Sequence, residues 1–178
     1  MSPEILVVTA LRLIVPLSIF RWPLGGGIAS LILDAFDCQI ASYVGCRLPN
    51  YILTDKYFDT YYLTIELIVS RSWSNPLTKN TALALYIWKF IGIVAFQISG
   101  TEKWLIIAPN LFEYFFLFYI AVQVFGKESI KKTWFNSYKK IALVLLFILI
   151  IKIPQEILLH LWKEPLESVY SWLNQIMR

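Results

Sequence analysis

The chain has 178 residues, of which 58% are hydrophobic and 16% are charged, and its mean hydropathy is +0.62. Soluble domains are closer to half apolar and a quarter charged, so a single soluble domain of this length could not bury so much apolar surface. The composition therefore excludes a soluble globular enzyme, a disordered chain and a nucleic-acid-binding module. The net charge of +4 is not an argument for nucleic-acid binding, because most basic residues flank apolar runs, where they suit contact with anionic lipid headgroups at least as well. We expect an all-α, multi-pass integral membrane protein in which residues 1–178 form one transmembrane domain.

A membrane-spanning helix needs roughly 20 mostly apolar residues. Six segments of the chain reach or approach that length, and we expect helices at residues 5–20, 28–45, 54–70, 81–98, 104–125 and 141–162. The N-terminus has no short apolar core followed by a small-residue cleavage site, so we expect no removable signal peptide.

Proline, glycine and polar residues mark the expected breaks in the first half of the chain. The stretch 21–27 contains a proline and three consecutive glycines, which disfavour a continuing helix. Residues 46–50 predict a turn. Thr54 is expected to be the N-cap of the next helix, with Asp55 in its first turn.

The second half of the chain has fewer breaks. Residues 71–79 contain an Asn-Pro pair and predict a polar loop. Pro154 predicts a kink in the last long helix. The segment 163–178 is short and contains Tyr170 and Trp172, which favours a helix lying in the membrane interface.

The basic residues leave the membrane orientation open. With six spans, the loop after the fifth helix lies on the opposite side of the membrane from the turn at 46–53. The loop after the fifth helix carries a cluster of five lysines, Lys127, Lys131, Lys132, Lys139 and Lys140. The positive-inside rule predicts that this cluster is cytoplasmic, which would place the turn at 46–53 outside.

All aspartates of the chain lie in two pairs at the facing ends of the second and third expected helices. They are Asp34, Asp37, Asp55 and Asp59. The spacings i, i+3 and i, i+4 place each pair on one helix face. A short turn makes the two helices antiparallel neighbours, so we expect the pairs to meet.

Four converging carboxylates need neutralising, because an ionisable group within a span costs about 2.5–3.5 kcal/mol. Lys56 is the only cation in register on these two helices. A divalent cation is the economical alternative, and an all-oxygen ligand set favours Mg²⁺, Mn²⁺ or Ca²⁺. The competing interpretation is that the acids lie at helix ends in the wet interface, where Asp55 would simply complement the helix dipole.

The pattern of these acids resembles the CDP-alcohol phosphotransferase family, whose motif is D-x2-D-G-x2-A-R-x8-G-x3-D-x3-D. The four aspartates fall in register without a gap, and so does Ala41. The stretch from Thr9 through Arg12 to Pro16 is similar to the T-x2-R-x3-P of that family's first helix. The resemblance covers residues 9–60 by motif, and the rest of the chain only by length and helix count.

The chain departs from the motif at three positions. Cys38 replaces the first glycine, Ser42 replaces the arginine, and Tyr51 replaces the second glycine. In the family the glycines make room for the nucleotide, and a tyrosine does not permit the close backbone approach that glycine does. Arg47 is a candidate for a displaced cation. The resemblance is therefore to a divergent member, in which Cys38, Ala41, Ser42 and Tyr51 line the expected substrate-binding region.

The resemblance implies a divalent-metal-dependent transferase, with Mg²⁺ or Mn²⁺ held by the four aspartates. Such an enzyme moves a substituted phosphate from a CDP-linked donor to an alcohol or lipid acceptor, in many cases during phospholipid biosynthesis. Asp59 would accept the proton of the attacking alcohol as general base, and CMP would leave. The family also implies a homodimer.

Two other classes stay open. The departures at Cys38, Ser42 and Tyr51 are compatible with a non-catalytic relative that acts as a membrane interaction or regulatory subunit. Six spans with charges inside them are compatible with a transporter, although no inverted repeat is visible.

The fourth and fifth expected spans contain further polar residues. Asn110 and Glu113 lie one helical turn apart, and Lys89 lies in the preceding span. Polar groups at such positions are either functional or paired with one another. A Lys89–Glu113 pair and a Glu113 facing the aspartates are both open alternatives.

Overall fold

The computed structural model describes the backbone of residues 3–43, 51–101 and 103–160, and the side chains of residues 6–35, 54–101, 103–131 and 133–154. Within these ranges every regular element is a helix, which confirms the all-α class. The elements are α1 (Pro3–Ile14), η1 (Val15–Phe20), α2 (Pro23–Tyr43), α3 (Tyr51–Ser70), α4 (Pro76–Ser99), α5 (Lys103–Ile107), α6 (Leu111–Phe125), α7 (Glu128–Trp134) and α8 (Tyr138–His160). The turn expected at 46–50 and the segment 163–178 lie outside the described residues.

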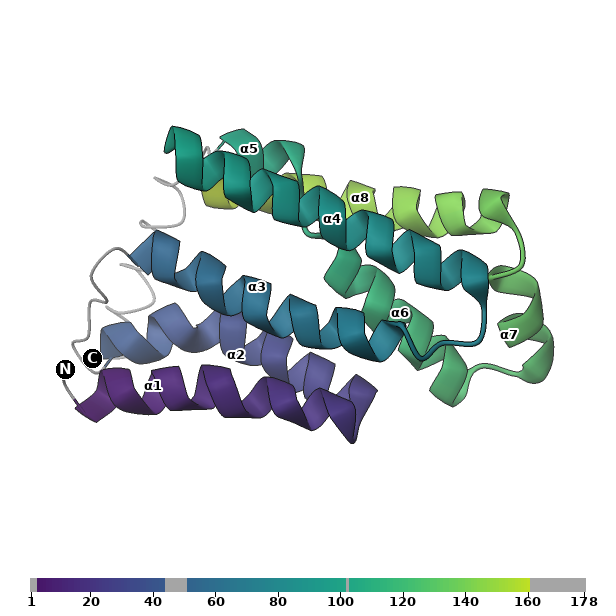
Figure 1. Cartoon of the computed structure of the whole chain (residues 1–178), viewed down its shortest axis with the longest axis horizontal. Coiled ribbons are helices and arrows are strands. Elements are labelled where there is room, and N and C mark those ends of the chain that lie inside the picture. Colours follow the sequence, from purple (N-terminus) through teal and green to yellow (C-terminus); the bar gives the residue numbers. More distant parts are fainter. Residues whose placement is uncertain (1–2, 44–50, 102, 161–178) are drawn as a thin grey trace, which may run out of the picture.

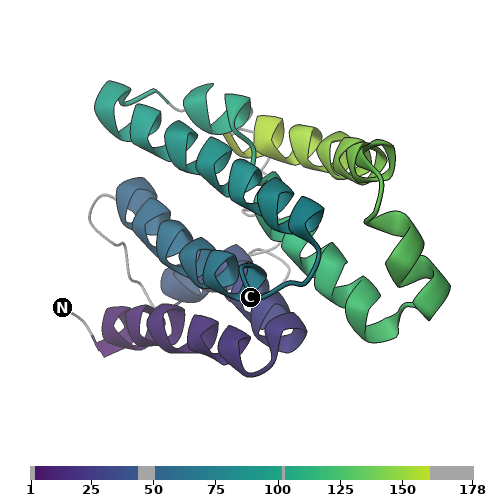
Figure 2. The same ribbon diagram turned by 45° about the vertical axis from the view of Figure 1, so that its right-hand side comes forward.

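The helices form two groups joined by α6 (Figures 1 and 2). Helices α1, α2 and α3 lie side by side, and α4, α5 and α8 form a second group along α3. Helix α6 crosses from one group to the other and contacts α2, α3, α4 and α8. Its buried aromatic side chains lie at the centre of the core, with Phe112, Phe115 and Phe116 fully buried.

The break between the first two helices is shorter than the expected residues 21–27, so that prediction is wrong. Helix α2 begins at Pro23 and contains all three glycines, so only Arg21 and Trp22 separate it from η1. Proline is favoured in the first turn of a helix, where its missing N–H costs nothing. A Cβ on Gly26 would lie 2.5 Å from the backbone nitrogen of Ile19, and one on Gly27 would lie 2.7 Å from Leu117. Gly26 and Gly27 therefore permit close helix packing rather than helix termination.

Two expected helix starts also shift. Helix α3 begins at Tyr51, so Thr54 lies inside the helix and is not its N-cap. Helix α4 begins at Pro76 rather than near residue 81. The side chain of Asn75 caps it by accepting hydrogen bonds from the backbone N–H groups of Leu77 and Thr78. The polar loop expected at 71–79 is correspondingly shorter.

The expected fifth span is not one continuous helix. It is divided into α5 and α6 by Ala108, Pro109 and Asn110. Pro109 has no backbone N–H to continue the ladder, and the side chain of Asn110 accepts a hydrogen bond from the backbone of Glu113 to begin α6. The short helix α7 was not expected. Pro154 lies inside α8, and the kink expected there stays a prediction.

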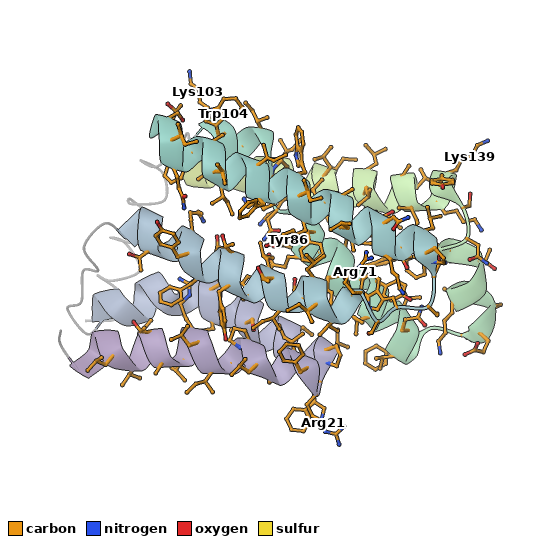
Figure 3. All side chains as sticks on the ribbon, viewed as in Figure 1. Arg21, Arg71, Tyr86, Lys103, Trp104 and Lys139 are labelled. Atoms are coloured by element: carbon orange, nitrogen blue, oxygen red, sulfur yellow. The ribbon has the colours of Figure 1, made fainter. Side chains whose placement is uncertain are left out.

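Two stretches are long and apolar enough to cross a membrane, Pro76–Ser99 and Lys103–Phe125. Only 28% of the most apolar window of the first is buried inside the protein. Large apolar side chains also lie exposed along α1, α4 and α8, where side chains project from the bundle (Figure 3). They include Val7, Ile14, Ile91, Ile98, Phe147 and Ile150. Exposed apolar surface of this kind marks contact with a membrane or with another protein.

Candidate functional site

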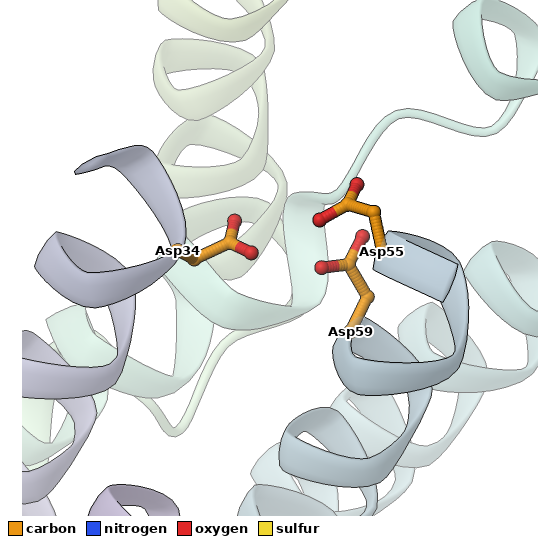
Figure 4. A group of neighbouring side chains, drawn as sticks. All are labelled: Asp34, Asp55 and Asp59. Carbon is orange, nitrogen blue, oxygen red and sulfur yellow. The ribbon is translucent and has the colours of Figure 1, made fainter. Parts of the chain in front are cut away.

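Three of the four predicted aspartates meet where α2 and α3 approach each other. Asp34 extends from α2 toward Asp55 and Asp59 of α3 (Figure 4). One carboxylate oxygen from each lies within 4.8 Å of one from each of the others. Asp55 and Asp59 are one helical turn apart, so the i, i+4 spacing places them on one face as expected. Asp59 is the most deeply placed of the three, with 6% of its surface exposed.

An arginine from the first helix lies among these acids. Arg12 Nη1 donates to Asp55 Oδ1 at 2.8 Å, and Nη2 donates to Asp59 Oδ1 at 3.3 Å. Nη2 also donates to Asp34 Oδ1. The guanidinium is packed against the ring of Phe58, 4.9 Å from its centroid. Arg12 is therefore part of the site, although the sequence pattern placed it only in the stretch leading to the motif.

A second cation comes from α3 itself. Lys56 Nζ donates to Asp55 Oδ2 at 2.8 Å and to Asp59 Oδ2 at 2.7 Å. Unlike Arg12, it makes both contacts within its own helix. The described cluster thus joins three carboxylates to two cations. The expectation that Lys56 is the only nearby cation, with a divalent ion to neutralise the acids, overlooked Arg12.

The donor set fits a divalent cation. Three carboxylates from two helices converge, and hard oxygen ligands are those that Mg²⁺ and Mn²⁺ prefer. Arg12 contacts one oxygen of each of these three carboxylates. Metal and guanidinium are therefore alternative partners of the same carboxylates.

The remaining predicted site residues lie beside this cluster in the chain. Asp37, Cys38, Ala41 and Ser42 are in the last turns of α2, and Tyr51 is the first residue of α3. Their side chains lie outside the described residues. Among the described side chains, a hollow of about 10 Å³ adjoins the cluster, lined by Arg12, Ser30, Asp34 and Tyr62 among others. It has room for one water molecule.

A second polar group lies deeper in the bundle, one and two turns further along the same face of α3. Tyr62 and Glu66 follow Asp59 at helical spacing and are buried, Glu66 completely. Within the part of the chain that the structure describes, no hydrogen-bond partner is found for either carboxylate oxygen of Glu66, for the Tyr62 hydroxyl or for Glu113 Oε1. Glu113 Oε2 accepts from Asn110 Nδ2 at 2.7 Å. Glu66 was not among the predicted site residues, although an acid in the middle of an apolar helix is the kind of signal that marks a functional or paired group.

Two further lysines, Lys89 and Lys152, are also buried. Lys89 donates to the backbone carbonyl of Ala108 at 3.3 Å, in the break between α5 and α6. Lys152 of α8 donates to the Tyr114 hydroxyl at 3.5 Å and lies over its ring.

A larger polar hollow, of about 320 Å³, lies at the other end of the bundle, beside α7. Its lining includes Asn75, Gln123 and Lys131. Lys131 is paired with Glu128 at 3.0 Å. Because these opposite charges lie side by side, the lining favours neither an anion nor a cation as a ligand.

Comparisons with protein-family models, curated proteins and solved structures found no match to the chain. The candidate function therefore depends on the residues of the site and on the motif resemblance.

Proposed function

We propose that the chain is a divalent-metal-dependent membrane transferase, a divergent member of the CDP-alcohol phosphotransferase family. It would move a substituted phosphate from a CDP-linked donor to an alcohol or lipid acceptor. The observation that carries this proposal is the convergence of Asp34, Asp55 and Asp59, with oxygens within 4.8 Å of one another. These acids occupy the motif positions from which the family binds metal.

The metal ligands we propose are these three aspartates and Asp37, with Mg²⁺ or Mn²⁺ as the ion. A bound divalent ion would neutralise the diphosphate of the donor and align it for in-line displacement. Asp59 is the proposed general base because its carboxylate is the deepest of the cluster. It would take the proton of the acceptor hydroxyl while the new P–O bond forms and CMP leaves. The proposed substrate-binding region is formed by Cys38, Ala41, Ser42 and Tyr51.

The proposed setting is a six-span homodimer embedded in a membrane. In addition to the two stretches named above, α2, α3 and α8 have 21, 20 and 23 residues, and roughly 20 suffice for a span. The first span would consist of α1 and η1. The cluster would then lie well inside the span, because Asp34 is the twelfth of the 21 residues of α2 and Asp59 is the ninth of the 20 residues of α3. A water-soluble donor would have to reach it from the side of the membrane on which α2 ends and α3 begins.

A specific observation also favours the non-catalytic alternative. Arg12 and Lys56 satisfy the three acids without a metal. A chain that kept the acids only as an internal ion-pair network would need no substrate, and the departures at Cys38, Ser42 and Tyr51 agree with that. Such a chain would act through partners in the membrane.

Thermal unfolding of the detergent-purified protein separates the two functions. The protein is melted with EDTA, with Mn²⁺, and with Mn²⁺ plus CMP or a CDP-alcohol. A ligand at about 100 times its dissociation constant stabilises by about 2.7 kcal/mol. The transferase predicts a shift with Mn²⁺ and a further shift with the cytidine ligand. A shift with neither would contradict the transferase and favour the non-catalytic relative.

A further inference from the structure

Arg12 contacts every described carboxylate of the candidate metal site. We propose that it is an internal cation that closes the acidic cluster in the metal-free protein and competes with a divalent ion for Asp34, Asp55 and Asp59. This inference rests on the proposed function in one respect, namely that a divalent ion is the competitor. It adds that the metal-free and metal-bound proteins differ in the position of the Arg12 side chain.

The contacts of Arg12 are made to the carboxylates that a metal would need. Its two terminal nitrogens bind the Oδ1 atoms of all three acids, and these acids come from two helices. Mg²⁺ binds carboxylate oxygens at about 2.0–2.1 Å, so an ion shared by the three would lie between them. That is where the guanidinium lies. The two cations repel each other at such distances, so binding of the metal requires the guanidinium to withdraw.

Lys56 does not have this role. Its ammonium contacts the Oδ2 atoms of Asp55 and Asp59, both within one turn of α3. It can therefore hold these two side chains in place without linking α3 to another helix. Among the described residues, Arg12 is the cation that contacts acids of both α2 and α3, and it comes from a third helix, α1.

The surroundings of Arg12 hold it in the cluster when no metal is bound. Its side chain is 5% exposed and packs against Phe58. Helix α1 is fixed to α3 by a hydrogen bond from the Tyr61 hydroxyl to the backbone carbonyl of Leu13, at 2.9 Å. The guanidinium fork matches several carboxylates at once, which a single ammonium cannot do.

The experiment compares Mn²⁺ affinity and metal-free stability in wild type, Arg12→Gln and Arg12→Lys. Hydrogen bonds between charged groups are strong enough that removing a competing set should tighten Mn²⁺ binding by a factor of about ten or more in Arg12→Gln. The same variant should melt at a lower temperature than wild type in EDTA, and Mn²⁺ should raise its melting temperature by more than it raises that of wild type.

Two further variants keep the test informative. Arg12→Lys retains the charge but loses the fork, so it should fold and bind Mn²⁺ with intermediate affinity. Arg21→Gln is the matched control, because Arg21 is exposed at the turn between η1 and α2, away from the acids (Figure 3). It removes the same formal charge and should leave Mn²⁺ affinity unchanged.

The outcomes separate this inference from the proposed function. Equal Mn²⁺ affinity in wild type, Arg12→Gln and Arg12→Lys would overturn the competition and leave the transferase standing. Binding by Arg12→Gln but not by wild type would support the competition and contradict the transferase, because Arg12 would then be the permanent cation of the site. An absence of binding in every variant would overturn both.

Discussion

Arg12 Nη1 donates to Asp55 Oδ1 at 2.8 Å across 43 residues of sequence, and this contact ties the first helix to the third. It places a positive charge where the aspartate motif alone indicates only a metal. The ion-pair network and the candidate metal site are therefore built from the same three carboxylates. Measurements on the acids must distinguish a structural role from the proposed catalytic one.

Asp59→Asn tests the proposed general base. The amide keeps the shape of the side chain and can still offer an oxygen to a metal, but it cannot accept a proton at neutral pH. We expect turnover to fall by about 10²–10⁴-fold, with most of the Mn²⁺ affinity retained through the other aspartates. The measurement is CMP release together with Mn²⁺ titration of the same preparation. Turnover equal to that of wild type would remove Asp59 from the role of base.

Gly26→Ala tests the close packing of α2 against η1. The added Cβ would lie 2.5 Å from the backbone nitrogen of Ile19, so the backbone must shift. We expect a loss of about 1–3 kcal/mol in the free energy of unfolding. Gly25→Ala is the control, because its nearest neighbour would be Trp22 Cβ at 3.9 Å, an ordinary contact. It should be neutral or stabilising by about 0.5–1 kcal/mol. Equal melting temperatures for the two variants would contradict the packing described here.

Glu66→Gln tests the deep polar group of α3. Glu66 is completely buried, and neither of its carboxylate oxygens has a hydrogen-bond partner. An amide is less costly to bury than a carboxylate and brings an N–H₂ donor that Glu113 Oε1 lacks. We expect the melting temperature to be unchanged or raised. Glu66→Leu, which fills similar space without polar atoms, is the matched comparison. A loss of several kcal/mol in Glu66→Gln would mean that Glu66 has a charged partner.

Cysteine labelling tests the proposed topology. The start of α3, where Tyr51 lies, and helix α7 are at opposite ends of the bundle (Figure 1). In a background with Cys38 and Cys46 replaced, a single cysteine at Ser137 should therefore label from the opposite side of the membrane to one at Tyr51. A transferase that uses cytoplasmic CDP-alcohols predicts that position 51 labels from the cytoplasm. Labelling of both positions from the same side would contradict the six-span arrangement.

The sequence predicted the long helices well because their apolar runs are of near-spanning length. Helices α2, α3, α4 and α8 lie where the runs predict them, although their ends move by several residues. The errors have local causes. Gly26 and Gly27 of α2 lie inside the helix and allow close packing against Ile19 and Leu117, which composition alone does not show. Pro109 divides the fifth run because Asn110 then caps a new helix.

The candidate site was predictable in its acids and not in its cations. Helical spacing places Asp55 and Asp59 on one face, and a short connection brings Asp34 to them. A sequence pattern does not show which side chain of a distant helix packs beside these acids. Arg12 lies 22 residues before Asp34 and 47 before Asp59, and only the packing of α1 against α2 and α3 brings it there.

The central claim is that the aspartates bind a divalent metal, and Mn²⁺ stoichiometry in the purified protein tests it most directly. Wild type should bind Mn²⁺ at a fixed stoichiometry, and Asp34→Ala and Asp55→Ala should each abolish that binding. Glu128→Ala is the control, because it removes an exposed acid paired with Lys131 and far from the cluster, and it should bind as wild type does. Unchanged Mn²⁺ stoichiometry in Asp34→Ala and Asp55→Ala would contradict the account.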